Sequence, residues 1–405
     1  MAIIRPFKGI FYNQKKIALN KVTAPPYDVI SGKEVGNLYR QSRYNIIRLI
    51  AGRTISLPLT SSVQGLPETQ KSGYRQAKEL FHKWLEKGIL QEASKPALYI
   101  YRQRYYSPSS FQEKVRVGFF SLLKLNQQGK GVFSHEKTFS FPIKDRLRLL
   151  QECSANFSAI FALYEDRQRE ISGVISKYLK RKPRIDFCDA QKVGHTLWAI
   201  EKEDDINLLI KKMRRKPIFI ADGHHRYSAA LRFYQEMKTK ESSFVLTYLA
   251  EMNEDNISVL PTHRVVFLTE KEREDFWERV KRLFEVEVIS RPIRTHSLEI
   301  YYQGDYYLLK PKSSFSDNPL ALLHNILIKK VLGIKSSEEK ERIRYTHSSQ
   351  EAIELARKHK GVAFFIESFK LEEIKKIISK GKTLPRKSTY FYPKLLSGMV
   401  MRKVS

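Results

Sequence analysis

The sequence contains very few cysteines. Only Cys153 and Cys188 occur among its 405 residues, and no Cys-x-x-Cys pair is present. Two thiols cannot form a disulfide framework or a zinc site built from thiolates. We therefore exclude both, and we expect the two cysteines to be reduced residues of the core.

Long apolar runs are also lacking. No stretch reaches the roughly 18–20 uncharged apolar residues that a membrane helix needs. The first apolar residues are interrupted by Arg5 and Pro6, which is not the layout of a signal peptide. We therefore expect a cytoplasmic location and no membrane partner.

Three common motifs of nucleotide binding and nucleophilic catalysis are missing. The sequence has no Gly-x-x-x-x-Gly-Lys-Ser/Thr, no Gly-x-Gly-x-x-Gly and no Gly-x-Ser-x-Gly. The run Gly381-Lys382-Thr383 lacks the upstream glycine because position 376 is Lys. If this protein handles phosphate, it must use another architecture.

Negative charge is scarce relative to positive charge. The 73 Lys and Arg residues outnumber the 43 Asp and Glu residues, which gives a formal charge of +30. The basic residues recur in nearly every segment, which favours a surface spread over the whole fold rather than a nucleic-acid patch. We expect only weak, non-specific nucleic-acid binding that falls with salt, and attraction of anionic metabolites.

The pattern of apolar residues predicts a mixed α/β (α+β) fold. Hydrophobic residues make up 42% of the chain, and strand-like and helix-like segments alternate. We expect helices at 69–90, 142–153 and 371–379, and strands at 97–106, 114–120, 158–164, 217–221 and 361–366. We predict two domains, 1–268 and 269–405, with 385–394 returning to the site, and a surface loop at 55–70.

The strongest candidate site is the segment from Ala221 to Arg226. An apolar strand ends at Asp222, a natural helix N-cap, Gly223 turns the chain, and a helix follows. The first turn of that helix presents unpaired N–H groups and the positive end of the dipole, which suits an anion.

The first turn of this predicted helix also carries three potential cations, His224, His225 and Arg226. Cations are disfavoured there, so we expect a bound anion to compensate them and replacement of Arg226 to cost the fold little. Alternatively, the histidines simply pack and Arg226 meets a surface carboxylate. A shared metal ion is a further alternative, although neighbouring helical residues point apart.

Other candidate residues form four weaker groups. Two prolines stiffen the chain before Tyr27 and Asp28, where a carboxylate can act as a base or merely cap a turn. The further candidates are His135, Glu136, Thr138, Asp145 and Arg146; Thr262, His263 and Arg264; and Lys387, Ser388, Thr389, Tyr390 and Lys394. Exposure in a first helical turn explains Asp145 and Arg146 as well as a role in a site does.

Several of these segments resemble a bacterial and archaeal family of domains of unknown function. The resembling segments follow the family's order and are 24–31, 135–138 with 145–147, 156–164, 195–198, 221–227, 260–264 and 387–394. The Asp-Gly-His-His-Arg element at 222–226 also resembles a motif of the ParB/sulfiredoxin-like superfamily. That superfamily includes DNA-partition proteins and kinases of free serine.

The resemblance implies a ParB/sulfiredoxin-like core with additional α/β lobes, and a small-molecule kinase. In the free serine kinases a similar turn holds nucleotide phosphates and a carboxylate activates the serine hydroxyl. Transfer from ATP or ADP to free L-serine or a similar metabolite is thus implied here. Gly223, His224, His225 and Arg226 would hold phosphate, Asp28 or Glu136 would accept the proton, and Asp222 would help to place Mg²⁺.

Two alternatives from other classes remain. The charge and the superfamily resemblance also fit a nucleotide-responsive ParB-like DNA-binding protein, but the sequence contains no convincing helix-turn-helix or coiled-coil segment. A nuclease that uses the same turn on a phosphodiester is the third reading. The oligomeric state does not follow from the sequence.

Overall fold

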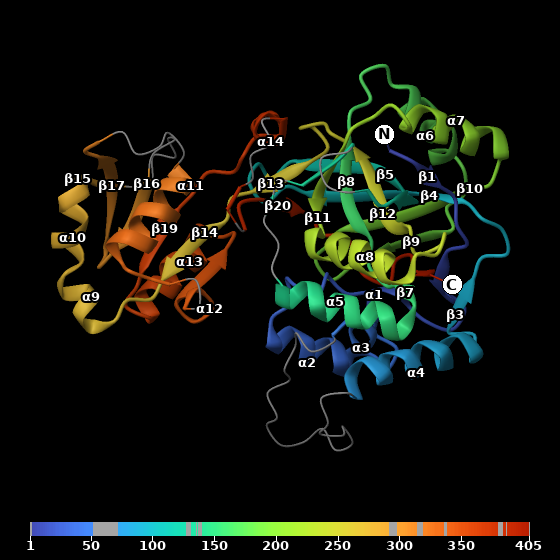
Figure 1. The fold of residues 1–405 in the computed structure, drawn as a ribbon, viewed down its shortest axis with the longest axis horizontal. Helices are drawn as coiled ribbons and strands as arrows, with labels where there is room; N and C mark the ends of the chain where they lie inside the picture. The colour runs from blue at the N-terminus through green and yellow to red at the C-terminus, as the bar shows by residue number, and fades with distance from the viewer. Residues whose placement is uncertain are drawn as a thin grey trace. The chain divides into compact units, whose positions relative to one another are not determined.

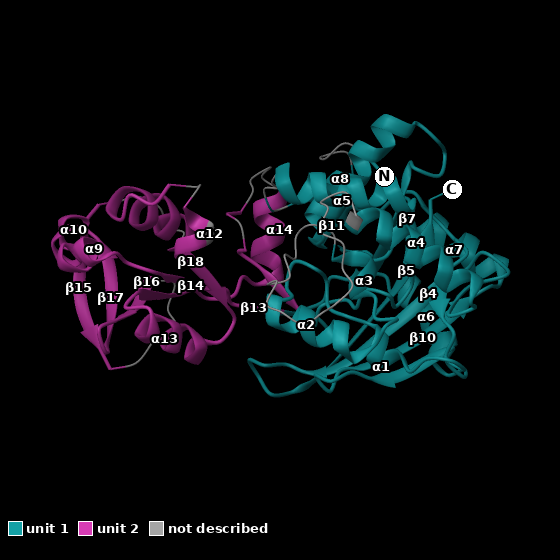
Figure 2. Cartoon of the chain, turned by 90° about the horizontal axis from the view of Figure 1, so that it is seen from below, with its two compact units in different colours: residues 1–258, 393–405 teal, residues 259–392 magenta. Residues whose placement is uncertain are grey.

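The structure is a computed structural model. It describes residues 2–51, 72–126, 131–134, 136, 140–290, 298–313, 319–335, 338–379, 384–385 and 387–404. The chain forms two compact units, residues 1–258 with 393–405 and residues 259–392 (Figure 2). The mixed α+β architecture predicted from the sequence is confirmed. Within the described part of the chain, no helix is long and apolar enough to cross a membrane.

Unit 1 contains a large mixed sheet. Its strands lie in the order β6 (Val132–Ser134), β11 (Ile218–Asp222), β8 (Ile160–Tyr164), β12 (Phe244–Glu251), β5 (Glu113–Lys124), β4 (Leu98–Tyr106), β10 (Gly194–Ile200) and β9 (Ile185–Cys188), and β1 (Ile4–Arg5) also pairs with β5 (Figure 1). The pairs β6–β11 and β8–β12 are parallel, and the other pairs are antiparallel.

Helices cover one face of this sheet because their apolar stripes point at it. The core there combines sheet residues such as Ile160 and Leu249 with residues of α6 (Glu170–Leu179), α7 (Glu203–Met213) and α8 (His224–Met237). The smaller elements of unit 1 are α1 (Leu19–Val22), α2 (Gly32–Gln41), α3 (Ile47–Ile50), α4 (Ser72–Glu86), α5 (Ser140–Cys153), β2 (Ile10–Tyr12), β3 (Leu90–Glu92), β7 (Ala155–Asn156) and β21 (Arg402–Lys403). Helix α8 packs on α5, and α5 packs on α4 (Figure 1).

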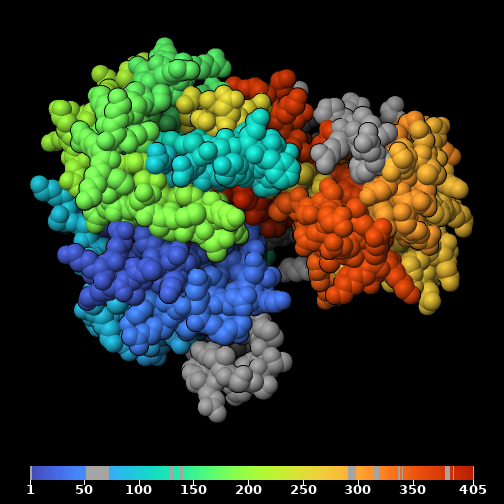
Figure 3. All heavy atoms as spheres, turned by 180° about the vertical axis from the view of Figure 1, so that it is seen from behind, coloured from blue at the N-terminus to red at the C-terminus, as the bar shows by residue number. Residues whose placement is uncertain are grey.

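The opposite face of the sheet carries aromatic residues, and the N-terminal segment packs on it. Tyr99 of β4 packs edge to face on Phe7 and Phe11 of the N-terminal segment. That segment also reaches the edge strand, since Gln14 Nε2 donates to Arg184 O at 2.9 Å. Figure 3 shows the blue surface of the N-terminal part of the chain next to green surface of unit 1.

Unit 2 contains an antiparallel sheet. Its strands lie in the order β15 (Phe284–Ile289), β17 (Asp305–Pro311), β16 (Leu298–Tyr302), β19 (Val362–Phe365), β14 (His263–Val266) and β18 (Ile343–Thr346). Around it lie α9 (Glu270–Glu274), α10 (Phe276–Leu283), α11 (Pro319–Leu322), the π-helix η1 (Leu323–Val331), α12 (Glu339–Arg342), α13 (Ser349–Lys358) and α14 (Leu371–Ser379). The short strands β13 (Ser258–Leu260) and β20 (Tyr390–Tyr392) pair with each other.

The predicted elements appear close to their expected positions. Helix α4 buries Tyr74, Ala77, Phe81 and Trp84, and it ends before Gly88, which has a φ of +61°. The strands expected at 97–106 and 114–120 are the antiparallel pair β4–β5. The loop predicted at 55–70 lies outside the described residues.

Two details differ from the sequence-based expectations. Cys153 is buried in α5, but Cys188 is exposed because it ends the edge strand β9, so the expectation that both are core residues was wrong for Cys188. The two units divide the chain near 258 and 392 rather than at 268, because β14 pairs with β18 and β19 of unit 2.

Candidate functional site

The segment from Ala221 to Tyr227 is a strand end that turns into a helix. Strand β11 ends at Asp222, Gly223 occupies the N-cap position with φ 91° and ψ 27°, and α8 begins at His224. The pairing of β11 with β8 is irregular between Ile220 and Asp222, and such irregularities redirect side chains at strand ends. The predicted strand–turn–helix is confirmed, but Asp222 is not the N-cap, because its carboxylate has other partners.

We expect Gly223→Ala to destabilise the protein by about 1–2 kcal/mol, because only glycine adopts this left-handed backbone without strain. A Cβ at position 223 would also lie 3.0 Å from Arg226 Cζ and displace the guanidinium. Urea denaturation measures the effect. The matched control is Gly173→Ala in α6, where a Cβ meets nothing within 4 Å and should be tolerated. Equal stability of the two variants would contradict the strain argument.

The carboxylate of Asp222 holds two cations. Arg226 Nη2 donates to Asp222 Oδ2 at 2.6 Å, and Lys394 Nζ donates to Asp222 Oδ1 at 2.5 Å. Arg226 Nη1 donates to Ala159 O at the start of β8. Burial would by itself raise the pKa of Asp222, but Lys394 and Arg226 outweigh it and hold this pKa below its usual range. The clash of cations expected at this helix start is therefore offset by a carboxylate of the protein itself.

His224 is buried beside another acid. Its Nδ1 lies 4.0 Å from Glu136 Oε2, and burial lowers the pKa of His224 to about 4. The imidazole is therefore neutral at pH 7, which removes one of the three potential cations of this turn. His225 is half-buried. His135 and Thr138, predicted beside Glu136, lie outside the described residues.

We expect His224 to make stability fall as the pH drops from about 6.5 to about 4. The folded state holds the pKa of His224 near 4, below its ordinary 6.5, so the unfolded chain binds the proton first in this window. The free energy of unfolding, measured in urea at several pH values, should show this slope in the wild type and lose it in His224→Gln. Replacement of the exposed His82 by Gln should keep it. An unchanged slope in His224→Gln would show that other groups cause it.

A small pocket lies between Arg226 and Arg146. It has a volume of about 50 Å³, and its polar lining comes from Tyr27, Arg146, Asn156, Ser158 and Arg226. A space of this size holds a few waters or one small anionic group rather than a whole nucleotide. Two guanidinium groups from α5 and α8 therefore meet one cavity.

Arg146 is fixed as firmly as Arg226. Its guanidinium donates to Asp145 Oδ2 and to Ile50 O, and it stacks 3.8 Å from the ring centroid of Tyr27. Tyr74 Oη donates to the other oxygen of Asp145 at 2.5 Å. Asp145 and Arg146 are both buried, so exposure in a first helical turn does not explain them.

Asp28 and Tyr27 differ in their surroundings. Tyr27 is 4% exposed and lines the pocket, and burial and the charge of Asp28 raise its pKa. Asp28 itself is exposed on the turn beside the pocket-lining Tyr27. Its part as a proton acceptor stays a prediction.

Two residues that the sequence did not single out position Lys394. Arg116 and Gln103 are paired across β5 and β4, and Arg116 is fully buried. Arg116 Nη2 donates to Pro393 O at 2.5 Å, and Gln103 Nε2 donates to Lys394 O at 3.2 Å. The only sequence signal was polar side chains inside otherwise apolar strands, which does not reveal a partner almost three hundred residues away.

The Thr262–Arg264 motif has contacts within unit 2. His263 Nε2 lies 3.1 Å from Ser349 Oγ, and Ile366 N donates to His263 Nδ1 at 3.2 Å. Arg264 donates to Thr262 O and, at 3.0 Å, to Lys387 O. These contacts link β14 to Ser349 of α13, to Ile366 after β19 and to Lys387, and a role of the motif in a site stays a prediction.

The remaining tail residues also make contacts within unit 2. Ser388 Oγ donates to Pro385 O, and the ring centroids of Tyr390 and His347 lie 3.6 Å apart. Lys387 is exposed and Thr389 is half-buried. Of the predicted tail residues, Lys394 belongs to unit 1 and meets Asp222 there.

The side chains at this turn do not fit a magnesium ion. Mg²⁺ prefers carboxylate oxygens and water, whereas both oxygens of Asp222 accept hydrogen bonds from cations. Among the residues that the structure describes, no group of three or more His, Cys, Asp or Glu side chains can hold a metal ion. The expectation that Asp222 places Mg²⁺ therefore finds no support in these contacts, and no step of the proposed reaction passes through this ion.

The fold and the site define a mixed α+β protein with a buried network of carboxylates and cations at a strand-to-helix turn. Residues 4–332 match the family described as protein of unknown function, DUF1015, and the chain belongs to this family. The family membership predicted from the sequence motifs is thus confirmed. No curated protein matches the chain.

Several solved structures are similar to this chain at low identity. A conserved hypothetical protein from Pyrococcus furiosus has 13% identity and a TM-score of 0.37, covering 70% of this chain and 93% of its own. A free serine kinase in complex with AMP has 15% identity and a TM-score of 0.38, covering 71% and 90%. SbnI from Staphylococcus aureus has 11% identity and a TM-score of 0.39, covering 69% and 85%. Likenesses at this level carry no argument about the reaction.

Proposed function

We propose that the chain is a phosphotransferase that moves a phosphoryl group from ATP or ADP to the hydroxyl of free L-serine or a similar small metabolite. One observation carries the proposal. Two guanidinium groups, Arg146 and Arg226, line one small pocket at the start of α8, and each is fixed by its own carboxylate. Positioned cations are what phosphoryl transfer needs most, since its transition state spreads negative charge over the equatorial oxygens.

The phosphoryl group would lie in the pocket beside the first turn of α8. Each guanidinium has five N–H donors, and its hydrogen bonds to protein oxygens leave other donors for a ligand. The residues of α8 that line the pocket are Arg226, Ala229 and Ala230, so the N-terminal half of this helix contributes the positive side of its dipole. The pocket of about 50 Å³ accommodates one phosphoryl group, so the rest of the nucleotide would lie outside it.

The proton of the acceptor hydroxyl would pass to a carboxylate of the protein. In the proposed reaction the acceptor oxygen bonds to phosphorus, the bond to the nucleotide breaks, and the departing nucleotide keeps its electron pair. The hydroxyl proton passes to Glu136 or Asp28. Glu136 is favoured by its place beside the neutral His224, whereas Asp28 is exposed and freer to move.

The test is a screen of the purified full chain with ATP, ADP and CTP against the free amino acids. Mass spectrometry reads the phosphorylated product. Phosphoserine, or another phosphorylated hydroxy compound, formed at the expense of ATP or ADP is the expected result. Binding of ATP and ADP, measured separately by calorimetry, distinguishes an unsuitable acceptor from a site that does not take nucleotides. If the screen yields no phosphorylated product and calorimetry shows no nucleotide binding, the proposal is wrong.

A further inference from the structure

A second cavity lies wholly in unit 2. It has a volume of about 460 Å³, within the range of roughly 300–1,000 Å³ typical of small-molecule sites. It opens where β16 and α13 end, next to α9, and its polar lining comes from Arg273, Tyr301, Gln303, Arg357 and Lys360. None of the sequence motifs pointed to it.

The charged residues of this lining are all cationic. Arg273 comes from α9, Arg357 from α13 and Lys360 from the turn after α13, and no Asp or Glu is among the described residues that line the cavity. Cations gathered around one space repel each other, and a bound anion removes that repulsion. The lining therefore selects negative ligands.

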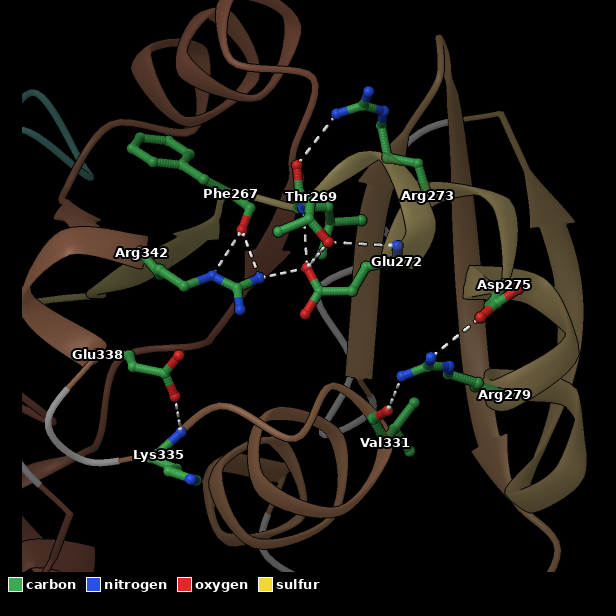
Figure 4. A network of polar contacts seen from close by, with 11 residues as sticks. Phe267, Thr269, Glu272, Arg273, Asp275, Arg279, Val331, Lys335, Glu338 and Arg342 are labelled. Carbon is green, nitrogen blue, oxygen red and sulfur yellow. Dashed lines mark hydrogen bonds and ion pairs between the residues drawn. The ribbon is translucent and has the colours of Figure 1, made fainter.

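The acids near these cations accept hydrogen bonds from other residues. The carboxylate of Glu272 accepts hydrogen bonds from Arg342 and Thr269, while Arg273 points away from it and donates to Leu268 O at 3.0 Å (Figure 4). On α13, Glu354 lies one turn before Arg357 and accepts a hydrogen bond from Gln350 at 3.1 Å. Glu354 also attracts Arg357 electrostatically, so it offsets part of the positive charge at that residue.

Two buried tyrosines at the end of β16 organise these cations. Arg357 Nε donates to Tyr301 Oη at 2.5 Å, and Tyr302 Oη donates to Arg273 O at 3.2 Å. Tyr301 and Tyr302 are 2% and 1% exposed, so they are rigid supports. A guanidinium held by one N–H group presents its remaining donors in a fixed fork, which costs little further entropy on binding.

We infer that this cavity binds a small metabolite that carries phosphate groups. Two arginines and a lysine around one space match the several charged oxygens of such a ligand, because each guanidinium can grip two phosphate oxygens. Cations at the end of a helix also complement its dipole, which by itself explains Arg357 and Lys360. The dipole of α13 does not explain Arg273, which comes from another helix, and it does not explain the presence of a cavity. The inference uses residues of unit 2 alone and does not depend on the proposed phosphotransferase activity.

The experiment is calorimetric titration of the full chain with inorganic pyrophosphate, with citrate as a carboxylate comparator. We expect Arg357→Ala and, independently, Arg273→Ala to weaken pyrophosphate binding about tenfold or more, because each removes a hydrogen bond to a charged group. The matched controls Lys358→Ala and Lys271→Ala remove exposed charges one and two residues away from these arginines and outside the lining. Both lysine variants should bind pyrophosphate like the wild type.

Three results would overturn the inference. The first is that the wild type does not bind pyrophosphate. The second is that the lysine variants bind pyrophosphate as weakly as the arginine variants do. The third is that citrate binds as tightly as pyrophosphate. The second result would indicate attraction to the basic surface as a whole, and the third would indicate a polycarboxylate site. Thermal melts of all variants verify that the arginine variants are folded.

Discussion

Arg226→Ala should lower the rate of phosphoryl transfer by about 10²–10³, the usual cost of losing one positioned group that stabilises transition-state charge. Arg226 lines the small pocket and is held by Asp222 and Ala159. Its guanidinium therefore meets a developing charge without having to reorganise. Steady-state turnover with the acceptor found in the screen, together with nucleotide affinity, measures the loss.

The same variant should also be less stable, contrary to what the sequence suggested. From its place in a first helical turn, Arg226 appeared removable at little cost. In the structure its loss leaves Ala159 O and one oxygen of Asp222 without their donor, which costs about 1–3 kcal/mol. Lys394 still pairs with Asp222, so the loss should not unfold the protein.

Two further variants separate charge from geometry. Arg226→Lys keeps the charge but lacks the planar fork, so it should restore activity only in part. Arg232→Ala removes an exposed cation from the same helix and should change neither turnover nor stability. If Arg226→Ala melts earlier yet keeps its nucleotide affinity and turnover, Arg226 is structural and the proposed role is wrong.

Asp222→Asn should destabilise the protein by about 3–5 kcal/mol at pH 7, the usual cost of removing one partner from a buried ion pair. The side chain of Asp222 is 16% exposed and lies within hydrogen-bond distance of both Arg226 and Lys394. Asparagine keeps the shape but not the charge, so two cations would face each other across a neutral amide. Urea denaturation at pH 7 gives the difference in the free energy of unfolding.

The pH dependence of this effect has a definite sign. The folded state holds the pKa of Asp222 below its ordinary 3.8, so its contribution is complete above that pH and is lost as the pH falls through the folded value. The stabilities of wild type and Asp222→Asn should therefore converge only below about pH 3.8. The fall in the free energy of unfolding that His224 causes lies at higher pH, so both proteins should show it.

A matched control for Asp222→Asn exists in unit 2. Asp275 also pairs with an arginine four residues later, but both side chains are about one-third exposed, at 35% and 33%. Asp275→Asn should cost only about 0–1 kcal/mol, because solvent screens exposed pairs. Equal losses in the two variants would show that burial does not strengthen the Asp222 network.

The local elements around the site followed from the sequence because their causes are local. An apolar run ending at Asp222, a glycine, and an apolar face on Tyr227 and Ala230 require a strand, a turn and a helix. The same holds for α4 and for the hairpin β4–β5, whose periodicities are 3.6 and 2. Family membership also followed, because the resembling segments are runs of contiguous residues that can be compared without a structure.

The partners of each charged side chain did not follow from the sequence. Lys394 reaches Asp222 across 172 positions, Arg116 binds Pro393 across 277, and Tyr74 binds Asp145 across 71. No periodicity encodes such separations, because they depend on the order of strands in the sheet and on the return of the C-terminal segment. For the same reason the sequence predicted Asp222 as a cap and allowed Asp145 to be exposed.

The sequence by itself determined the fold class, the strand-to-helix turn with its glycine, and the family, all of which depend on residues close together in the chain. Only the tertiary structure decided which carboxylate neutralises Arg226, that His224 is neutral, and that unit 2 contains a cationic cavity. Charge and protonation depend on distance and burial in space, and these quantities exist only once segments far apart in the sequence have packed together.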